Sequence, residues 1–456
     1  MSVISELPKI LKAGIKKHNV PGATVAIYRN GHVTQAAAGV LNVVTKVRAT
    51  TDSVFRIASI TKVFTATLIM QLSDEGKVDI DQPLRAYLPD FAVADADAGA
   101  QMTLRQLSCH SSGIEGDFFV DSGRGEDSVA RLQDMGRLLP QIFTPGERFS
   151  YCNYGYGMLG RVIEVVTGGT YDDALKNRIY KPLGMQNALA LPEDALRFRC
   201  AIGHLPHPKK KGVSALTSSP YAPYRGLKAA GATASMAVGD LMKFVDMHLR
   251  GGVTKAGTRI LSRASVRAMQ RRQIKLPKYA PLGTVGWGLG WTLHDWTGVR
   301  VIGHGGTGNG QDSFLHILPE KKLAFALFCN GGDTLGLFET VCRATFDKLA
   351  RADMPTNPDP ADNLDIDPSR IVGRYENLNG IWQVSCNGAV VKVELKAKAV
   401  PMWEDIPPTP VRFIDRNTAC LVAHDPIGAM TLTFDGNDPK RPDFLGWHYR
   451  LFRRCA

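Results

Sequence analysis

The stretch that decides the fold is Phe55-Arg56-Ile57-Ala58-Ser59-Ile60-Thr61-Lys62, in which a serine stands three residues before a lysine. The segment before the serine looks like a strand. Residues 63–72 after it are predicted to form a buried helix, because they are apolar on nearly every face and contain no proline or glycine. Residues i and i+3 share one face of a helix, so the Ser59 hydroxyl and the Lys62 amine are expected to meet.

The Ser59–Lys62 pair indicates nucleophilic chemistry. A serine hydroxyl is a weak nucleophile until a neighbouring base takes its proton. A lysine at the start of an apolar helix can be that base, because burial lowers the pKa of an ammonium group. The alternative interpretation is that Ser59 caps the helix and that Lys62 is solvated, and the pair alone does not decide between the two.

Composition and charge exclude several classes of function. With 456 residues, 44% hydrophobic and 21% charged, the chain has the make-up of a soluble globular protein of two or three domains. The net charge of +12 would suit a nucleic-acid partner. The lysines and arginines are scattered, however, and the one dense basic run, residues 209–211, is predicted to be a solvated loop. We therefore expect no nucleic-acid partner.

Cysteine spacing argues against a metal site or a bound cofactor, and hydropathy argues against a membrane-spanning segment. None of the eight cysteines forms a Cys-x-x-Cys pair, and no His/Cys cluster has metal-ligand spacing, so no metal and no cofactor is expected. The N-terminus has no apolar signal core, and no run reaches the ~18 apolar residues of a membrane span. A reduced cytoplasmic protein is the expectation, with no membrane partner, and the oligomeric state is left open.

The order of predicted elements indicates a catalytic domain over residues 1–352. Two strands, 23–29 and 32–37, flank the turn Asn30-Gly31. A mainly helical subdomain follows over about 95–225, and strands return between 287 and 329, beginning with 288–293. The predicted fold class is α/β (α+β), an antiparallel sheet flanked by helices with a helical subdomain.

A second domain follows at the C-terminus. Residues 353–368, rich in proline and aspartate, are predicted to be a linker. Residues 369–456 contain short alternating strands, with Asn387-Gly388 and Asp435-Gly436 as predicted hairpin turns. This pattern predicts a small all-β, barrel-like domain.

Two further motifs accompany the serine stretch: Tyr151-Cys152-Asn153, and His304-Gly305-Gly306 followed by Thr307. A second Tyr-x-Asn, residues 375–377, is discounted because it falls in the C-terminal domain. In order and spacing the motifs resemble the serine β-lactamase and penicillin-binding-protein superfamily. The likeness is closest to its class C β-lactamase-like branch, which includes DD-carboxypeptidases, D-aminopeptidases and carboxylesterases. It covers about residues 8–350.

The resemblance implies a role for each of three side chains. Ser59 attacks a carbonyl and becomes acylated. Lys62 activates the serine. Tyr151 shuttles the proton to the leaving group and then activates water for deacylation. Because a phenol titrates near about 10, this role needs nearby cations, Lys62 and His304, to stabilise the phenolate.

The resemblance also implies a substrate-binding edge. Asn153 is expected to bind the substrate carbonyl, and the backbone N–H groups of Ser59 and Thr307 to form the oxyanion hole. Gly305 and Gly306 would let the substrate run close along the strand. His110 lies in a Ser/Gly turn and is predicted to be structural.

This edge departs from the better-known pattern, since many relatives carry Lys-Thr-Gly where this chain has His304-Gly305-Gly306. Lysine and threonine grip a substrate carboxylate there. Histidine is only partly charged near neutrality, and Gly305 has no hydroxyl, so strong penicillinase activity is not expected.

The predicted function is a serine hydrolase that cleaves an amide or peptide bond of a small-molecule or short-peptide substrate through an acyl-enzyme on Ser59. Alternatives with the same fold are a carboxylesterase, an acyltransferase or a weak β-lactamase. From another class, a sensor trapped as its acyl-enzyme or a filament-type structural protein is also considered. An unrelated α/β-hydrolase is disfavoured because no Gly-x-Ser-x-Gly elbow is present. The C-terminal domain is expected to shape or gate the cleft.

Overall fold

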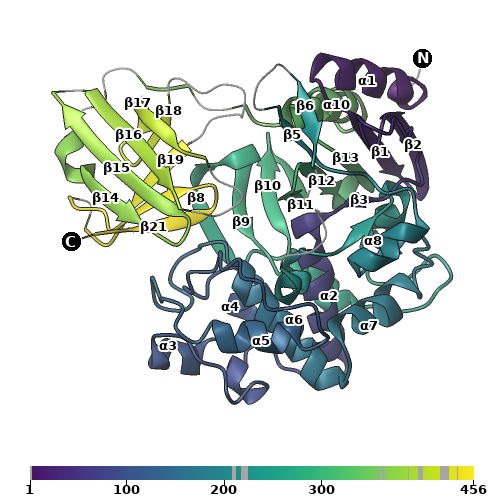
Figure 1. The fold of residues 1–456 in the computed structure, drawn as a ribbon, viewed down its shortest axis with the longest axis horizontal. Helices are drawn as coiled ribbons and strands as arrows, with labels where there is room; N and C mark the ends of the chain where they lie inside the picture. Colours follow the sequence, from purple (N-terminus) through teal and green to yellow (C-terminus); the bar gives the residue numbers. More distant parts are fainter. Residues whose placement is uncertain are drawn as a thin grey trace.

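The chain folds around two β structures, an eight-stranded open sheet and a closed eight-stranded barrel (Figure 1). Both are seen in a computed structural model that describes residues 3–207, 212–216, 224–356, 359–361, 364, 366–388, 390–398, 404–421, 431–438 and 440–455. The basic run at 209–211 and parts of the predicted linker lie outside the described residues. The fold class predicted from the sequence, with a barrel at the C-terminus, is confirmed.

The open sheet is antiparallel and joins the two ends of the catalytic part. Its strand order is β2-β1-β13-β12-β11-β10-β9-β8. The predicted first hairpin is confirmed: Asn30 and Gly31, with φ of 51° and 92°, form its two-residue turn. The strands are β1 (Gly22–Arg29), β2 (His32–Gly39), β8 (Ile274–Ala280), β9 (Thr284–Trp287), β10 (Thr292–Trp296), β11 (Val299–Gly308), β12 (Gln311–Leu318) and β13 (Leu323–Cys329).

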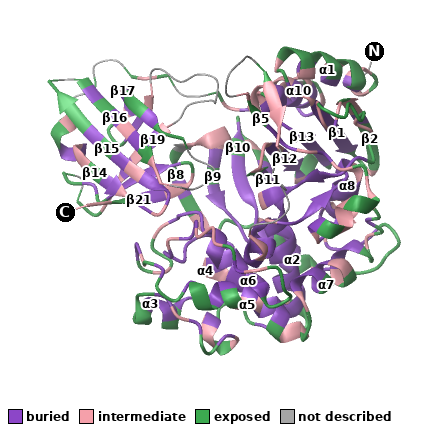
Figure 2. Ribbon diagram, viewed as in Figure 1, coloured by how far each residue is buried: buried purple, intermediate pink, exposed green. Residues whose placement is uncertain are grey.

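Both faces of the sheet are covered, and β13 shows how. Phe325 and Leu327 join the cluster that holds α1 (Val3–Lys17) and α10 (Thr334–Leu349) on one face. Ala324, Ala326 and Phe328 belong to the larger cluster on the other face, where α2 (Thr61–Asp74) and α8 (Val238–Leu249) lie. Successive side chains of a strand point to opposite faces, so a strand buried on both sides is apolar throughout. Figure 2 shows the sheet and α2 as the most buried parts of the ribbon.

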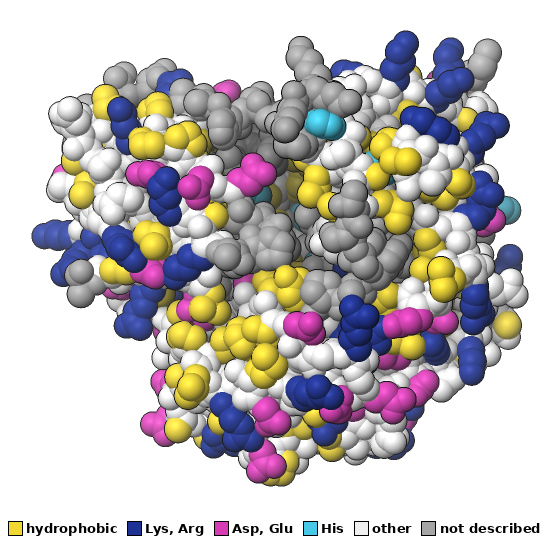
Figure 3. Space-filling view, in the orientation of Figure 1, with side chains coloured by type: hydrophobic (Ala, Val, Ile, Leu, Met, Phe, Trp, Pro, Cys, Tyr) yellow, Lys and Arg dark blue, Asp and Glu magenta, His cyan; other side chains and the backbone are white. Residues whose placement is uncertain are grey.

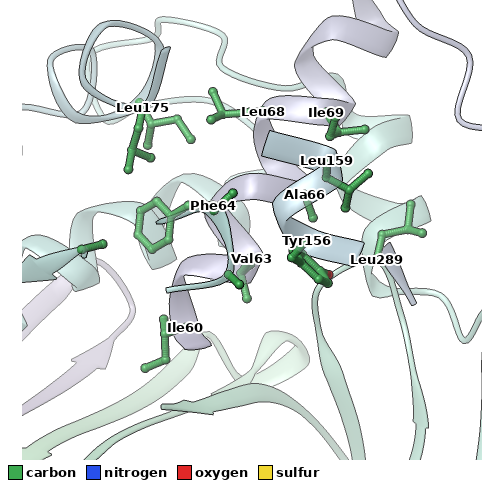
Figure 4. Packing of buried hydrophobic residues seen from close by; sticks show 14 of the residues in the cluster. Ile60, Val63, Phe64, Ala66, Leu68, Ile69, Tyr156, Leu159, Leu175 and Leu289 are labelled. Atoms are coloured by element: carbon green, nitrogen blue, oxygen red, sulfur yellow. The ribbon is translucent and has the colours of Figure 1, made fainter. Parts of the chain in front are cut away.

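Helix α2 is enclosed on every side, as predicted from its sequence. All residues from Thr61 to Leu72 are buried. Figure 4 shows α2 side chains packed against α6 (Asn153–Thr167) and α7 (Tyr171–Leu175), and Phe64 stacks on Phe244 of α8 with ring centroids 3.9 Å apart. An apolar surface all round suits a helix with no face to solvent, so the serine stretch opens the central helix of the domain.

The region beneath the sheet is mainly helical, with a short strand towards its end. It holds α3 (Ala96–Gln101), α4 (Leu104–Ser108), α5 (Ser128–Met135), α6 and α7, followed by β4 (Ala188–Leu189). The next two strands, β5 (His204–Pro206) and β6 (Val213–Ala215), pair with each other at the other side of the sheet, near α10 (Figure 1). Helix α4 begins with a capping box, in which Thr103 and Gln106 exchange side-chain-to-backbone hydrogen bonds. Since α4 and α5 both pack on α6, this region supports the helix that begins at the Tyr-x-Asn motif.

Two local predictions are wrong. The predicted strand at 288–293 is mostly the turn between β9 and β10, and Gly290 adopts φ 79° there, a left-handed conformation that suits glycine. Leu289 and Trp291 are apolar because they are buried, not because they form a strand. The predicted hairpin turn at Asp435-Gly436 is likewise a longer connection, since β19 ends at Asp435 and β20 begins at Phe444.

The barrel closes between its first and last strands, because β14 pairs with both β15 and β21. Side chains fill its interior, among them Trp382, Val393 and Leu432. The predicted turn at Asn387-Gly388 joins β15 to β16. The strands are β14 (Gly373–Glu376), β15 (Gly380–Asn387), β16 (Val390–Ala397), β17 (Ile406–Asp415), β18 (Thr418–Leu421), β19 (Thr431–Asp435), β20 (Phe444–Trp447) and β21 (Arg450–Arg454).

The barrel contacts the catalytic domain at the Tyr-x-Asn motif. The Tyr151 amide donates a hydrogen bond to the carbonyl of Tyr449 (2.8 Å), and the Leu451 amide donates to Ser150 Oγ (3.2 Å). Arg148 forms an ion pair with Asp435. The turn between β20 and β21 therefore lies directly beside the predicted catalytic tyrosine.

Candidate active site

A strained turn presents Ser59 at the start of α2. The short strand β3 (Phe55–Arg56) pairs with β7 (Ser235–Met236), and the chain then turns sharply at Ala58, whose φ is 43°. A positive φ is uncommon for any residue other than glycine. Gly231 faces this turn, and a Cβ there would stand 2.1 Å from the Ala58 carbonyl oxygen. The packing leaves Ser59 partly exposed while the residues on both sides of it are buried.

Lys62 is fully buried and contacts Ser59. Its Nζ lies 3.1 Å from Ser59 Oγ, 2.7 Å from Asn153 Oδ1 and 2.7 Å from the Ala230 carbonyl oxygen. Burial holds the pKa of Lys62 well below its usual value; the charge of Arg450 lowers it further, and Asp117 opposes the shift. Two fixed oxygen acceptors and the Ser59 hydroxyl thus surround the Lys62 amine at hydrogen-bonding distance.

The alternative interpretation of the Ser59–Lys62 pair is therefore wrong. Lys62 is not solvated, and Ser59 makes no side-chain cap at the start of α2 or of the 3-10 turn before it. The geometry is that of a serine hydroxyl facing a buried lysine amine.

Tyr151 completes the group around Ser59. It precedes α6, and its ring stacks on His110 with centroids 4.1 Å apart. Its hydroxyl is close enough to Ser59 for the serine side chain to lower the pKa of the phenol. Burial raises the pKa of Tyr151 well above its usual value, and Ser59 and the charge of Arg450 only partly offset this. Tyr151 is thus a neutral phenol at rest, contrary to the expected phenolate.

His304 is buried in β11 and carries no charge. Its Nδ1 lies 2.5 Å from the Gly305 carbonyl oxygen, and its Nε2 has no partner among the described residues. Burial lowers the pKa of His304 to about 3, helped by the nearby Lys62. The expectation that His304 would stabilise a phenolate as a cation is wrong. Arg450 supplies a positive charge beside the tyrosine, since its Cζ lies 4.7 Å from the centroid of the Tyr151 ring and its charge lowers the pKa of the phenol.

Strand β11 runs against the Ser59 turn. A Cβ on Gly306 would stand 2.1 Å from the Ile57 carbonyl oxygen and 3.1 Å from the Ser59 nitrogen, so only glycine fits at this position. The next residue, Thr307, is exposed, and its side chain hydrogen bonds with Asp312. The oxyanion hole built from the Ser59 and Thr307 amides remains a prediction, and this close approach supports it.

The fit at Gly306 gives a matched test. Gly306→Ala is expected to slow acylation of Ser59 by ~10²-fold or more, because the added methyl group displaces β11 from one wall of the oxyanion hole. Gly308→Ala is the control, since Gly308 lies on the same strand and a Cβ there would meet nothing within 4 Å. Burst kinetics with a p-nitrophenyl ester measure the acylation rate of each variant. Equal rates in the two variants would contradict this model of the site.

Sequence reasoning missed three residues of the site: Asp117, Asn379 and Arg450. Asn153 Nδ2 donates to Asp117 Oδ1 (2.5 Å). Asp117 Oδ2 also accepts from Arg450 Nε (2.7 Å) and from Asn379 Nδ2 (3.0 Å). The last two residues come from the barrel, and Arg450 stands 333 positions after Asp117. No local pattern marks any of the three, so only the folded chain reveals them.

His110 is structural, as predicted. Its Nδ1 accepts a hydrogen bond from the Cys152 amide (3.0 Å), and its ring supports the face of Tyr151. Burial holds its pKa well below the usual value, so the imidazole is neutral. His110 therefore fixes the backbone and ring of the Tyr-x-Asn motif.

The described part of the chain contains no cluster of three or more His, Cys, Asp or Glu side chains able to hold a metal ion. Among the same residues, no helix has the length and apolarity to cross a membrane. On the face seen in Figure 3, lysines and arginines are dispersed among acidic side chains rather than gathered into one patch.

A family model described as Beta-lactamase matches residues 7–346. The chain belongs to the β-lactamase family. Members of this family are serine hydrolases with this fold, and the match spans all the motifs around Ser59. The barrel lies outside it.

Individual relatives agree with this assignment. Penicillin-binding protein 4 of Amycolatopsis lactamdurans is 41% identical over 371 residues, covering 80% of this chain and 95% of that protein. The structure of SurE superposes with a TM-score of 0.77 at 26% identity and covers 99% of both chains, barrel included. A second SurE structure is described as being with D-Leu. The D-amino acid amidase of Ochrobactrum anthropi SV3 has a TM-score of 0.63 at 25% identity, over 76% of this chain and 99% of its own.

Proposed function

We propose that this chain is a serine amidohydrolase or peptidase that cleaves the amide bond of a small, amino-acid-derived substrate through an acyl-enzyme on Ser59. The observation that carries the proposal is the buried Lys62, whose Nζ lies 3.1 Å from Ser59 Oγ and whose pKa is lowered by burial. The amidase among the structural neighbours supports an amide substrate, and its name together with SurE with D-Leu supports a D-amino acid in that substrate.

Acylation begins when Ser59 Oγ attacks the substrate carbonyl carbon and the hydroxyl proton passes to Lys62 Nζ. The carbonyl oxygen becomes an oxyanion and binds the Ser59 and Thr307 amides. Tyr151 donates its phenolic proton to the leaving nitrogen and regains one from Lys62. The C–N bond breaks, and the acyl group stays on Ser59 as an ester.

Deacylation uses the same groups in the reverse direction. A water molecule attacks the ester carbonyl while Tyr151 and Lys62 together accept its proton. The Ser59 oxygen leaves and is reprotonated. A raised pKa makes the resting phenol a poor base by itself, so this step depends on the neutral lysine beside it.

Strong β-lactamase activity does not fit this site. A β-lactam presents a carboxylate, and the usual lysine and threonine that bind it are replaced by the neutral His304 and by Gly305. The acyl-trapping sensor is disfavoured because Ser59, Lys62 and Tyr151 are all in contact. Mass spectrometry after addition of a D-aminoacyl amide distinguishes an enzyme from a sensor, since a sensor keeps a stable adduct on Ser59 and an enzyme turns the substrate over.

A substrate panel tests the proposed function. We expect D-aminoacyl amides and short peptides with a D-residue to be turned over, and a chromogenic cephalosporin to be hydrolysed at least ~10²-fold more slowly in kcat/KM, since a site without its charged partner loses several kcal/mol. The panel includes the L-enantiomers and p-nitrophenyl esters. Turnover of esters with no amide cleavage would replace the proposal with a carboxylesterase, and a preference for amine over water as acceptor would indicate an acyltransferase.

A further inference from the structure

A chain of buried hydrogen bonds runs from the barrel to the nucleophile. Arg450 and Asn379, both in the barrel domain, donate to Asp117, which accepts from Asn153. Asn153 in turn accepts from Lys62, which contacts Ser59. The charged pair in this chain is well shielded, since the side chains of Arg450 and Asp117 are 12% and 2% exposed.

Asp117 determines which way the Asn153 amide points. An ionised carboxylate only accepts hydrogen bonds, so it must face the amide nitrogen. The amide oxygen is thereby directed at Lys62, where it meets an N–H of the amine at 2.7 Å. If the amide were flipped, its NH₂ group would face Lys62 and its oxygen would face the carboxylate, and two buried contacts would be lost.

Arg450 balances the charge of Asp117. Its Nε donates to Oδ2 at 2.7 Å and its Nη2 lies 3.4 Å from Oδ1, while Nη1 donates to the His448 carbonyl oxygen (2.8 Å). A buried carboxylate that loses its cation is strongly destabilising. The cation comes from the turn at the start of β21, which is anchored on the catalytic domain by the backbone of Tyr151.

We propose that the barrel is part of the catalytic apparatus: Arg450 is a positioning residue that acts through Asp117 and Asn153 to orient and tune Lys62. This proposal rests on the proposed function, since it assumes that Lys62 is the base for Ser59. The barrel thus does more than cover the cleft. Without Arg450 the catalytic domain keeps Ser59, Lys62 and Tyr151 but loses the charge balance next to them.

The charges near Lys62 predict opposite effects for the two members of the pair. Arg450 lowers the pKa of Lys62, and Asp117 raises it. The other titratable groups facing Lys62 are buried and uncharged at neutral pH; they are Tyr151, Cys152, Tyr156, His110 and His304. Removing Arg450 should therefore raise the pH at which Lys62 titrates, and removing Asp117 should lower it.

The test is the titration of Lys62 in the full chain. NMR of ¹³Cε-labelled lysine monitors the titration, and Lys62→Met identifies the Lys62 signal by its loss. We expect Arg450→Gln to move the midpoint up by about one pH unit and Asp117→Asn to move it down by a similar amount, the range for loss of one nearby charge. The double variant should return close to wild type. Arg450→Lys, which keeps the charge, should keep the wild-type midpoint and lose part of the rate.

The acid limb of the pH–rate profile for p-nitrophenyl acetate should move in step with these midpoints. Asp435→Asn is the control, because it removes an ion pair between the barrel and the catalytic domain that does not reach Asp117. If Arg450→Gln does not fold, the effect of removing Arg450 is measured as the difference between the Lys62 titration midpoints of Asp117→Asn and of the double variant.

The experiment distinguishes failure of the positioning role of Arg450 from failure of the proposed function. Unchanged midpoints in all variants would overturn the positioning role even if the enzyme is active. Displaced midpoints with no Ser59-dependent turnover of any substrate would leave the role of Arg450 intact and overturn the proposed function.

Discussion

Ser59→Ala is expected to lose ~10⁴-fold or more of the activity on the best substrate, the range found when a catalytic serine is removed. The loss should appear in kcat, because the hydroxyl forms the covalent intermediate and contributes little to substrate binding. Lys62 then faces a methyl group where its hydroxyl partner stood. Steady-state kinetics and intact-protein mass spectrometry both measure the effect, since no acyl adduct should form.

Ser73→Ala is the matched control for this experiment. Ser73 belongs to the same helix, lies near its C-terminal end and is partly exposed. Its rate should equal that of the wild type. Full activity in Ser59→Ala would contradict the acyl-enzyme mechanism as a whole, whereas a loss in both variants would indicate damage to α2 instead.

Much of the site could be predicted because α2 encodes it locally. The i, i+3 spacing brings Ser59 and Lys62 together within one turn, and the apolar run that follows predicts burial of the lysine. The hairpin turn at Asn30-Gly31 and the barrel could be predicted for the same reason, since a turn type or an alternating strand is written in a few adjacent residues.

What could not be predicted depends on contacts between distant segments. Asp117 and Arg450 belong to no motif, and their pairing arises only when the barrel docks beside Tyr151. The direction in which the pKa values of Tyr151 and His304 shift could not be predicted from the sequence, for a related reason. The sequence shows which charged residues exist, but the extent of burial, which outweighs those charges here, is a property of the packed fold.

Desolvation and charge act together on this site. Burial lowers the pKa of Lys62 and of His304 and raises the pKa of Tyr151. The buried ion pair of Arg450 with Asp117 then has a strong influence because little water screens it. In the proposed mechanism Lys62 is the base and Tyr151 the acid. Substitution of Tyr151 is therefore expected to separate acylation from deacylation.

Tyr151→Phe is expected to accumulate an acyl-enzyme. Lys62 still accepts the Ser59 proton, so a substrate with a good leaving group, such as a p-nitrophenyl ester, should acylate the variant. Deacylation should slow by ~10²–10⁴-fold, the range for loss of a general acid–base group. Stopped-flow measurement should show a burst of p-nitrophenolate equal to the enzyme concentration, followed by slow turnover, and mass spectrometry should show the adduct on Ser59.

Tyr154→Phe is the matched control, because Tyr154 is also buried at the start of α6 but its hydroxyl donates to the Gln133 carbonyl oxygen (3.2 Å), away from Ser59. It should lose about 1 kcal/mol of folding free energy with its hydrogen bond and keep its deacylation rate. Rapid turnover of acylated Tyr151→Phe would remove Tyr151 from the acid–base role and leave Lys62 to activate the water. Slow acylation with fast deacylation would instead assign Tyr151 to the leaving group alone.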